Sequence, residues 1–184
     1  MKKLSTIFVL CGTTRTIFDA SRASGPHTQT ETPAMDNSRQ HDDEKFMRLA
    51  INEARKALNE GEVPIGAVIV AGTTIVGRGH NLVETLCDAT AHAELQAITA
   101  AASTLGGKYL DTCTLYVTVE PCVMCAGAIA WSQVGRVVYG AADSKRGYTT
   151  VQGRILHPKT QVTAGVLADE CAALMSDFFA DLRR

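Results

Sequence analysis

TLYVTVEPCVMCAGAIAWSQVGRVVYG, residues 114–140, is the stretch that decides the fold. It begins with a continuous run of β-forming residues, 114–119, and ends with a second such run, 134–140. The segment 121–131 between them suits a helix, because it opens on a proline, which is favoured in a first helical turn. Neither run alternates polar and apolar residues, as expected for strands covered by helices on both faces. The stretch therefore predicts two strands of a central sheet, joined by a helix.

The chain before this stretch predicts a helix, a hairpin and a second helix. From residue 42, apolar residues recur at helical spacing with charged residues between them, and Gly61 ends the helix. Two short β-branched runs, 65–70 and 74–76, lie on either side of a turn and indicate a hairpin. The alanine-rich segment 91–105 carries one apolar face and is followed by two glycines, which stop helices. The apolar residues of the first helix are Phe46, Leu49, Ala50, Ala54, Ala57 and Leu58.

The chain after this stretch predicts a loop, a strand and a last helix. Residues 143–161 contain two glycines and a His-Pro pair, and we expect a loop with one short helix there. A brief strand near 161–164 leads into a helix, because apolar residues keep a helical period over 167–182. The alternation of helices and strands predicts an α/β fold, a three-layer α/β/α sandwich with a central mixed five-stranded sheet.

The composition limits the class of protein. With 184 residues, 46% of them hydrophobic, the chain suffices for one compact domain. Lys and Arg number 18 against 19 Asp and Glu, so the formal charge is -1 and no overall positive field attracts nucleic acid. Any such contact has to come from a local basic patch. No apolar run approaches the roughly 18 to 20 residues that span a membrane, so we expect a soluble, cytoplasmic protein without membrane association.

The segment 1–41 differs in character from the rest of the chain. It is rich in Ser, Thr, Gln and Pro, a composition typical of disordered segments. Two lysines and an apolar run at its start resemble a secretory signal, but the apolar run is short and charged residues follow soon. We expect residues 1–41 to be a disordered leader or a mis-assigned start, with Met35 as a candidate true start. Residues 42–184 are expected to form a single domain.

Metal-binding residue types stand at the predicted starts of two helices. His92-Ala93-Glu94 opens the second helix, and Pro-Cys-x-x-Cys, residues 121–125, opens the third. Strand ends in an α/β sheet gather the following helix starts at one edge, so these two starts can face each other. The two cysteines share a face of one helical turn, where the helix dipole favours their thiolates. The spacing predicts a zinc ion held by His92, Cys122 and Cys125.

Three protein ligands leave one position of a tetrahedral zinc site open, which is typical of catalytic sites. Zinc lowers the pKa of a bound water toward about 7. Glu94, two residues after His92, is placed to take the proton of that water and deliver it to a substrate. The pattern therefore predicts metal-assisted hydrolysis, with Glu94 as the general acid and base.

Two other kinds of site could use the same cysteines. A Cys-x-x-Cys pair can be redox-active, but the flanking aromatic and Gly-Pro spacing of thioredoxin-like sites are missing here. A structural zinc site would need a fourth ligand, for which Cys87, Cys113 or another histidine is a candidate. We expect Cys87 to be a buried small hydrophobic residue instead. The six cysteines are too few and too scattered for a disulfide scaffold.

The two motifs together carry a family resemblance. His-x-Glu followed by Pro-Cys-x-x-Cys is the signature by which zinc nucleobase deaminases, including those that act on tRNA, are recognised. Over residues 44–184 the chain also resembles the bacterial tRNA-specific adenosine deaminases, within the cytidine and deoxycytidylate deaminase superfamily. The segments that carry this resemblance are 62–68 (EVPIGAV), 90–94 (TAHAE), 114–128 (TLYVTVEPCVMCAGA) and 165–171 (GVLADEC).

The resemblance implies an activity, a cofactor and partners. The activity is deamination of adenosine to inosine at the wobble position of a tRNA anticodon stem-loop. The implied enzyme is a homodimer with the cytidine deaminase-like fold and one zinc ion (Zn2+) per subunit. The resemblance also implies that Asn81, which follows the second strand, contacts the nucleotide. Pro64 and the backbone N–H of Ala93 correspond to a pocket wall and a contact to the base.

Further residues are candidates for contacts to the RNA around the reacting base. A base in a folded RNA loop has to be splayed out of its stack, so the flanking nucleotides need phosphate and stacking partners. Basic and aromatic residues late in the chain can supply them, although such residues are also ordinary on surfaces and in helix cores. The candidates are Lys145, Arg146, Lys159, Arg183 and Arg184 for phosphates, and Phe178 or Phe179 for stacking.

Two alternative functions stay open at this point. The segment 147–161 does not follow the pattern of many members of the family, so substrate contacts there are in doubt. A deaminase of a free base or nucleoside, of the guanine or cytosine type, would share the zinc chemistry. It would differ only in the residues that surround the substrate pocket. A non-catalytic subunit with a deaminase fold would require loss of the proton carrier, yet Glu94 is present.

Overall fold

The computed structural model describes residues 37–184. Most of the predicted leader 1–41, with the candidate start Met35, lies outside the described residues. Its last residues belong to the helix α1 (Asn37–Asn59), which therefore begins before the predicted boundary at residue 42. Residues 38–42 are exposed on this helix, so no apolar periodicity marks them in the sequence.

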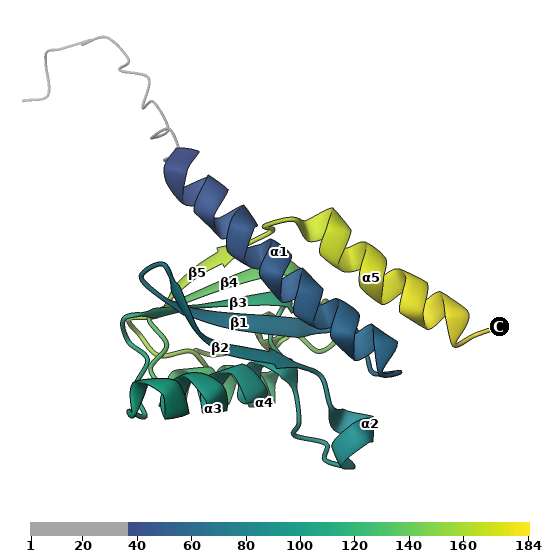
Figure 1. Cartoon of the computed structure of the whole chain (residues 1–184), viewed down its shortest axis with the longest axis horizontal. Helices are drawn as coiled ribbons and strands as arrows, with labels where there is room; N and C mark the ends of the chain where they lie inside the picture. Colours follow the sequence, from purple (N-terminus) through teal and green to yellow (C-terminus); the bar gives the residue numbers. More distant parts are fainter. Residues whose placement is uncertain (1–36) are drawn as a thin grey trace, which may run out of the picture. The chain divides into compact units, whose positions relative to one another are not determined.

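A mixed five-stranded sheet forms the centre of the described chain, in the order β2-β1-β3-β4-β5. β1 runs antiparallel to both β2 and β3, whereas β4 runs parallel to both β3 and β5. Figure 1 shows the strands side by side in this order. The strands are β1 (Gly66–Ala71), β2 (Thr74–His80), β3 (Cys113–Val119), β4 (Arg136–Ala141) and β5 (Gln161–Ala164).

Helices cover both faces of this sheet. α1 and α5 (Ala168–Asp181) lie on one face, and α3 (Ala93–Leu105) and α4 (Val123–Trp131) lie on the other (Figure 1). Each interface contains its own cluster of buried apolar side chains. The structure thus confirms the predicted three-layer α/β/α sandwich. Within residues 37–184, no helix has the length and apolar character needed to cross a membrane.

Two short elements complete the chain. The helix α2 (Val83–Leu86) follows β2 and buries none of its residues, so no apolar pattern predicts it. The 3-10 helix η1 (Tyr148–Thr150) is the short helix expected within the loop 143–161.

The strand directions bring several loops to one edge of the sheet. Because β1 is antiparallel to both neighbours, β2 runs in the same direction as β3 and β4. The carboxyl ends of these three strands therefore lie at one edge, which also receives the start of β1. In open α/β sheets, ligands bind beyond the carboxyl ends of the strands. The segments at this edge contain Pro64, Asn81, the Pro-Cys-x-x-Cys motif and the loop after residue 141.

Glycines in β2 allow α3 to lie directly on the strand. A Cβ atom at Gly79 would be 2.3 Å from the Ala93 carbonyl oxygen, and one at Gly77 would be 2.3 Å from that of Ala97. Real Cβ atoms do not approach this closely, so both positions require glycine. These glycines also explain why β2 is longer than the predicted run 74–76, since glycine weakens the sequence pattern of a strand.

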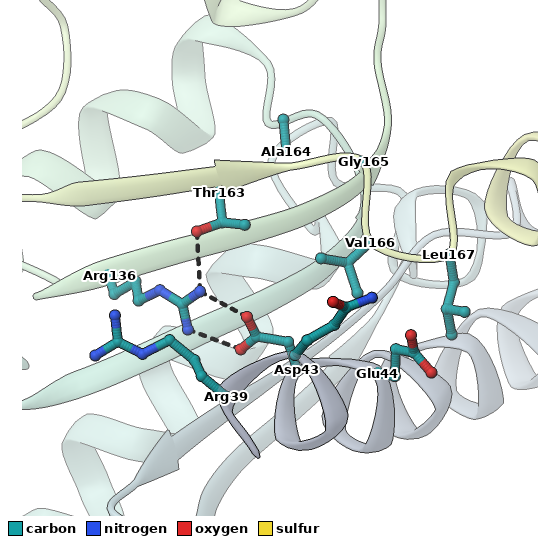
Figure 2. A pocket seen from close by; sticks show the side chains of 10 residues that line it. Arg39, Asp43, Glu44, Arg136, Thr163, Ala164, Gly165, Val166 and Leu167 are labelled. Carbon is teal, nitrogen blue, oxygen red and sulfur yellow. Dashed lines mark hydrogen bonds and ion pairs between the residues drawn. The ribbon is translucent and has the colours of Figure 1, made fainter. Parts of the chain in front are cut away.

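An ion-pair network ties α1 to the sheet on the opposite face. Asp43 of α1 accepts hydrogen bonds from both terminal nitrogens of Arg136, at 2.7 and 2.6 Å, and from the Tyr116 hydroxyl at 2.9 Å. Arg136 also donates to Thr163 Oγ1 at 2.9 Å, which connects β4 to β5 (Figure 2). A pocket of about 300 Å³ opens beside this network, and its lining includes none of the predicted site residues. The network therefore joins α1 to β3, β4 and β5.

Replacement of Gly79 tests the close packing of α3. We expect Gly79→Ala to lower the free energy of unfolding by about 1 to 3 kcal/mol, because overpacking displaces the helix from the strand. Denaturant unfolding of the zinc-loaded protein measures this change.

Gly107→Ala is the matched control, since a Cβ atom there meets nothing within 4 Å. We expect a change of no more than about 0.5 kcal/mol for this variant. If both substitutions lowered the free energy of unfolding equally, the close approach of α3 to Gly79 would not be the reason that this position requires glycine.

Candidate active site

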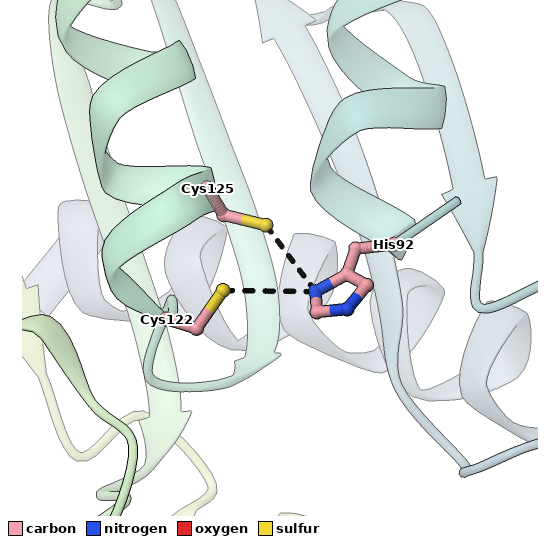
Figure 3. A group of neighbouring side chains, drawn as sticks. All are labelled: His92, Cys122 and Cys125. Atoms are coloured by element: carbon pink, nitrogen blue, oxygen red, sulfur yellow. Dashed lines mark hydrogen bonds between the residues drawn. The ribbon is translucent and has the colours of Figure 1, made fainter. Parts of the chain in front are cut away.

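The predicted metal ligands converge at the starts of α3 and α4. His92 is the residue that caps the N-terminus of α3, and Cys122 holds the same position in α4. The Nδ1 atom of His92 lies 3.7 Å from Cys122 Sγ and 3.5 Å from Cys125 Sγ. Figure 3 shows the imidazole ring facing both thiols across the gap between the two helices. All three ligand atoms lie within 4.8 Å of one another.

These distances fit a zinc ion. Tetrahedral bonds of about 2.0 Å to nitrogen and about 2.3 Å to sulfur separate the two kinds of ligand atom by about 3.5 Å. The separations from His92 are 3.5 and 3.7 Å. Cys125 is buried, whereas His92 and Cys122 are half-buried, so one side of the group stays accessible. The donor set and its spacing therefore suit zinc with an open position.

The other cysteines lie apart from this group. Among the residues that the structure describes, the cluster of metal-ligating side chains contains His92, Cys122 and Cys125 without a fourth member. Cys113 is buried at the start of β3. The expectation that Cys87 is buried is wrong: this residue ends α2 in a left-handed conformation with φ 51° and is exposed. The loop 84–90 is exposed throughout, and burial of Cys87 would require packing that this loop lacks.

Hydrogen bonds within the group favour a thiolate at Cys122. The bond from the Cys125 thiol, followed by that from His92, lowers the pKa of Cys122 to about 4. The bond to Cys122 raises the pKa of His92 in turn. The pKa of Cys125 is raised because it shares its proton with Cys122 and is buried. The backbone N–H of Cys125 also stabilises the Cys122 thiolate, as expected at a helix start.

Glu94 has an unpartnered carboxylate oxygen beside the metal ligands. It lies in the first turn of α3 and is buried. Within residues 37–184, Glu94 Oε2 is the one buried side-chain oxygen or nitrogen without a hydrogen-bond partner. Burial raises the pKa of this carboxyl. A buried acceptor without a partner is costly unless a ligand satisfies it, and a raised pKa lets a carboxyl carry a proton near neutral pH.

The three residues with implied substrate contacts lie around this group. Asn81 directly follows β2 and is buried, with its backbone N–H bonded to the Ile65 carbonyl at 3.1 Å. Pro64 is buried just before β1. Ala93 lies between His92 and Glu94 at the first position of α3. The sheet topology brings all of them to the edge that carries the metal ligands.

The loop after β4 also reaches the site. A bridge pairs Cys122 with Gly147, and the backbone N–H of Tyr148 donates to the Pro121 carbonyl at 2.9 Å, so Arg146 lies next in the chain to a residue paired with a predicted metal ligand. Asp143 Oδ1 accepts hydrogen bonds from the backbone N–H groups of Lys145 and Arg146, at 2.9 and 3.0 Å, and so forms a tight turn. The predicted contacts Lys145 and Arg146 are therefore exposed on an ordered turn beside the opening.

The remaining predicted RNA contacts have no described connection to the metal ligands. Phe178 and Phe179 contact each other edge to face, with ring centroids 5.3 Å apart. Arg184 pairs with Asp181 at 3.3 Å on the surface. In the part of the chain that is described, no hydrogen bond or ion pair joins these residues, Lys159 or Arg183 to the site. Their contacts to RNA stay predictions.

Two buried carboxylates were missed by the sequence reasoning. Glu120 accepts hydrogen bonds from Asp143 N at 3.0 Å and from Thr149 N and Oγ1, at 3.0 and 2.7 Å. It thus holds both ends of the loop that carries Arg146. Glu62 accepts hydrogen bonds from Asn81 and Thr85 on the other side of the site. Their signal in the sequence is a glutamate within the Pro-containing segments EVP (62–64) and VEP (119–121), each beside a β-forming run.

Comparisons with known proteins agree with this geometry. Residues 40–141 match the family model of the cytidine and deoxycytidylate deaminase zinc-binding region. The chain is 46% identical over 147 residues to the tRNA-specific adenosine deaminase of Bacillus subtilis, covering 77% of this chain and 91% of that protein. A solved structure from a study of A-to-I editing by tRNA:A34 deaminases is 40% identical, with a TM-score of 0.67 over 71% of this chain and 98% of that one.

A guanine deaminase is similar over a shorter part of the chain. The structure of the enzyme from Bacillus subtilis is 44% identical and has a TM-score of 0.52. The match covers 54% of this chain and 64% of that one.

Substitutions at the site separate metal binding from proton transfer. We expect Glu94→Gln to bind zinc as the unchanged protein does, because the side chain is not among the metal ligands and keeps its size. Cys122→Ser, the matched control, should lose most of its zinc, because it removes a thiolate ligand. Elemental analysis after dialysis measures the zinc content. Loss of zinc from Glu94→Gln would mean that this carboxylate is itself a ligand.

Proposed function

The chain belongs to the family defined by the cytidine and deoxycytidylate deaminase zinc-binding region, and we propose that it converts adenosine to inosine at the wobble position of a tRNA anticodon. The chemistry rests on one observation, the group of His92, Cys122 and Cys125 with the unpartnered Glu94 Oε2 beside it. The choice of substrate is supported by the similarity to tRNA-specific adenosine deaminases along nearly the whole described chain.

The residues of the site divide the reaction between them. His92, Cys122 and Cys125 would hold one zinc ion per subunit, which supplies an activated water by lowering its pKa to about 7. Glu94 would accept one proton of this water at Oε2 and deliver it to a ring nitrogen of the base, and then take up the second proton of the same water and deliver it to the departing amine. The net reaction consumes water and releases inosine and ammonia.

The base would be held by the residues around the metal ligands. The backbone N–H of Ala93 belongs to the first turn of α3, where N–H groups have no partner within the helix, so it can donate to the base. Pro64 supplies a rigid apolar wall, and Asn81 offers its amide to the nucleotide. The basic turn with Lys145 and Arg146 supports contacts to flanking phosphates, which fix the position of a splayed nucleotide.

Deamination of a free base is the alternative that an observation favours. The similarity to a guanine deaminase reaches 44% identity, although it covers 54% of this chain. A free base would use the same ligands and the same proton carrier, without phosphate contacts. A non-catalytic subunit would have no use for the buried, unpartnered carboxylate of Glu94.

We further propose that the protein is a homodimer. The outer face of α4 presents Val123, Met124 and Trp131 to solvent, with exposed fractions of 43%, 37% and 86%. Large exposed apolar patches on soluble proteins mark interaction sites. A second copy of the chain is the occupant that the family resemblance implies.

The substrate is tested with an anticodon stem-loop that carries adenosine at the wobble position. We expect the zinc-loaded protein to convert this adenosine to inosine and to leave free adenosine, cytosine and guanine unchanged. Glu94→Gln should lower the rate by about a hundredfold or more, since general acid and base catalysis contributes at least this much. Nucleoside analysis and release of ammonia measure the conversion. Turnover of a free base without turnover of the stem-loop would overturn the proposed substrate.

The proposed dimer is tested by placing a charged side chain on the exposed apolar face of α4. We expect the unchanged protein to have twice the monomer mass by light scattering, and Trp131→Lys to shift it toward monomer. Leu182→Lys is a control, because Leu182 is also a largely exposed apolar residue and directly follows α5, away from the α4 face. A monomeric unchanged protein, or a Trp131→Lys variant that dimerises as before, would contradict this interface.

A further inference from the structure

Glu62 is a fully buried carboxylate that the proposed chemistry does not use. It lies between the end of α1 and the start of β1. Its Oε2 accepts a hydrogen bond from Asn81 Nδ2 at 3.0 Å, and its Oε1 accepts one from the backbone N–H of Thr85 at 2.7 Å. Within residues 37–184 it takes part in no ion pair. Its two oxygens therefore serve only neutral donors, one of which is a predicted substrate contact.

The ionised state of Glu62 determines how Asn81 is oriented. Burial alone would raise the pKa of Glu62, but hydrogen bonds from the backbone of Thr85 and Glu84 and from side chains outweigh it and lower the pKa. An ionised carboxylate is an acceptor only, so the Asn81 amide has to turn its NH2 group toward Glu62. The carbonyl oxygen Oδ1 of Asn81 then points away from Glu62. Without such a partner, an amide can rotate by half a turn at little cost.

The second oxygen of Glu62, Oε1, binds the segment that follows Asn81. Its bond to Thr85 N anchors α2, and the residues 84–90 are all exposed. This segment lies between Asn81 and the predicted metal ligand His92. One buried carboxylate thus fixes both the amide and the start of the loop beside it.

We propose that Glu62 is a positioning residue for substrate recognition: by holding the Asn81 amide in one orientation, it sets how tightly the nucleotide binds and leaves the proton transfer by Glu94 unchanged. This proposal rests on the proposed function, because it takes Asn81 as a substrate contact. A merely structural carboxylate would instead affect stability without a selective effect on KM.

Glu62→Gln isolates the bond to Asn81. The glutamine keeps a carbonyl oxygen for Thr85 N and presents an NH2 group to Asn81, where it meets another NH2 group. Asn81 then has to rotate and reverse its donor and acceptor. We expect KM for the stem-loop to rise about tenfold or more and kcat to change by no more than about threefold, as for loss of uniform binding. The zinc content should not change.

Asp43→Asn is the matched control. It also converts a buried acid to an amide, but Asp43 lies in α1, and its partners Arg136 and Tyr116 lie on the opposite face of the sheet from α3 and α4. We expect this variant to lose stability and keep its KM. A rise in KM equal to that of Glu62→Gln would reduce the effect of Glu62 to general destabilisation and overturn the proposal.

A double-mutant cycle tests whether Glu62 acts through Asn81. We expect Asn81→Ala to raise KM by itself, and Glu62→Gln to change KM by no more than about twofold when added to Asn81→Ala. Additive effects of the two substitutions would overturn the proposal, because Glu62 would then act by another route.

A spectroscopic measurement keeps this test independent of the substrate. In the zinc-loaded protein, the NMR signals of the Asn81 side-chain NH2 should be protected from solvent exchange, and Glu62→Gln should shift them and remove the protection. Failure of the unchanged protein to convert the stem-loop would overturn the proposed function alone, and the cycle would then use the free base that is converted. Unchanged Asn81 signals in Glu62→Gln would overturn the role of Glu62, whatever the substrate.

Discussion

The approach of the starts of α3 and α4 is the constraint on which the rest of the structure depends. His92 Nδ1 lies 3.7 Å from Cys122 Sγ and 3.5 Å from Cys125 Sγ, at the start of α4. Small shifts of either helix would therefore separate the three ligand atoms. Two features of the sheet keep the helices in place. β2 and β3 run in the same direction and deliver both helices to one edge, and Gly77 and Gly79 let α3 lie against the backbone of β2.

Three buried carboxylates surround this group, and their partners assign them different tasks. Glu94 has an oxygen without any partner, so it is free to exchange a proton. Glu62 and Glu120 have their oxygens occupied by N–H and hydroxyl donors of the two loops that flank the opening. In the proposed function, the same functional group carries a proton where one oxygen has no partner, and holds a neighbouring loop where both oxygens accept hydrogen bonds. The loops themselves have few buried residues, so these bonds are among the contacts that order them.

The sequence predicted those parts of the protein that depend on local patterns. The grouping of His92, Cys122 and Cys125 follows from their spacing relative to helix starts, and the strand 161–164 from its β-forming residues. Contacts between distant residues escaped prediction: Glu120 and Thr149 are 29 positions apart, and only the fold brings them together. Local patterns also failed where packing is absent, as at the exposed helix α2 and at Cys87, or where glycine serves packing, as in the second half of β2.

X-ray absorption at the zinc edge, combined with the zinc content per chain, tests the central site most directly. The geometry of the three ligands predicts one zinc per chain with two sulfur ligands at about 2.3 Å and two nitrogen or oxygen ligands at about 2.0 to 2.1 Å. One of the lighter ligands is His92, and the other is exchangeable. A third sulfur ligand, a shell without sulfur, or a protein that retains no zinc would contradict a catalytic site at His92, Cys122 and Cys125.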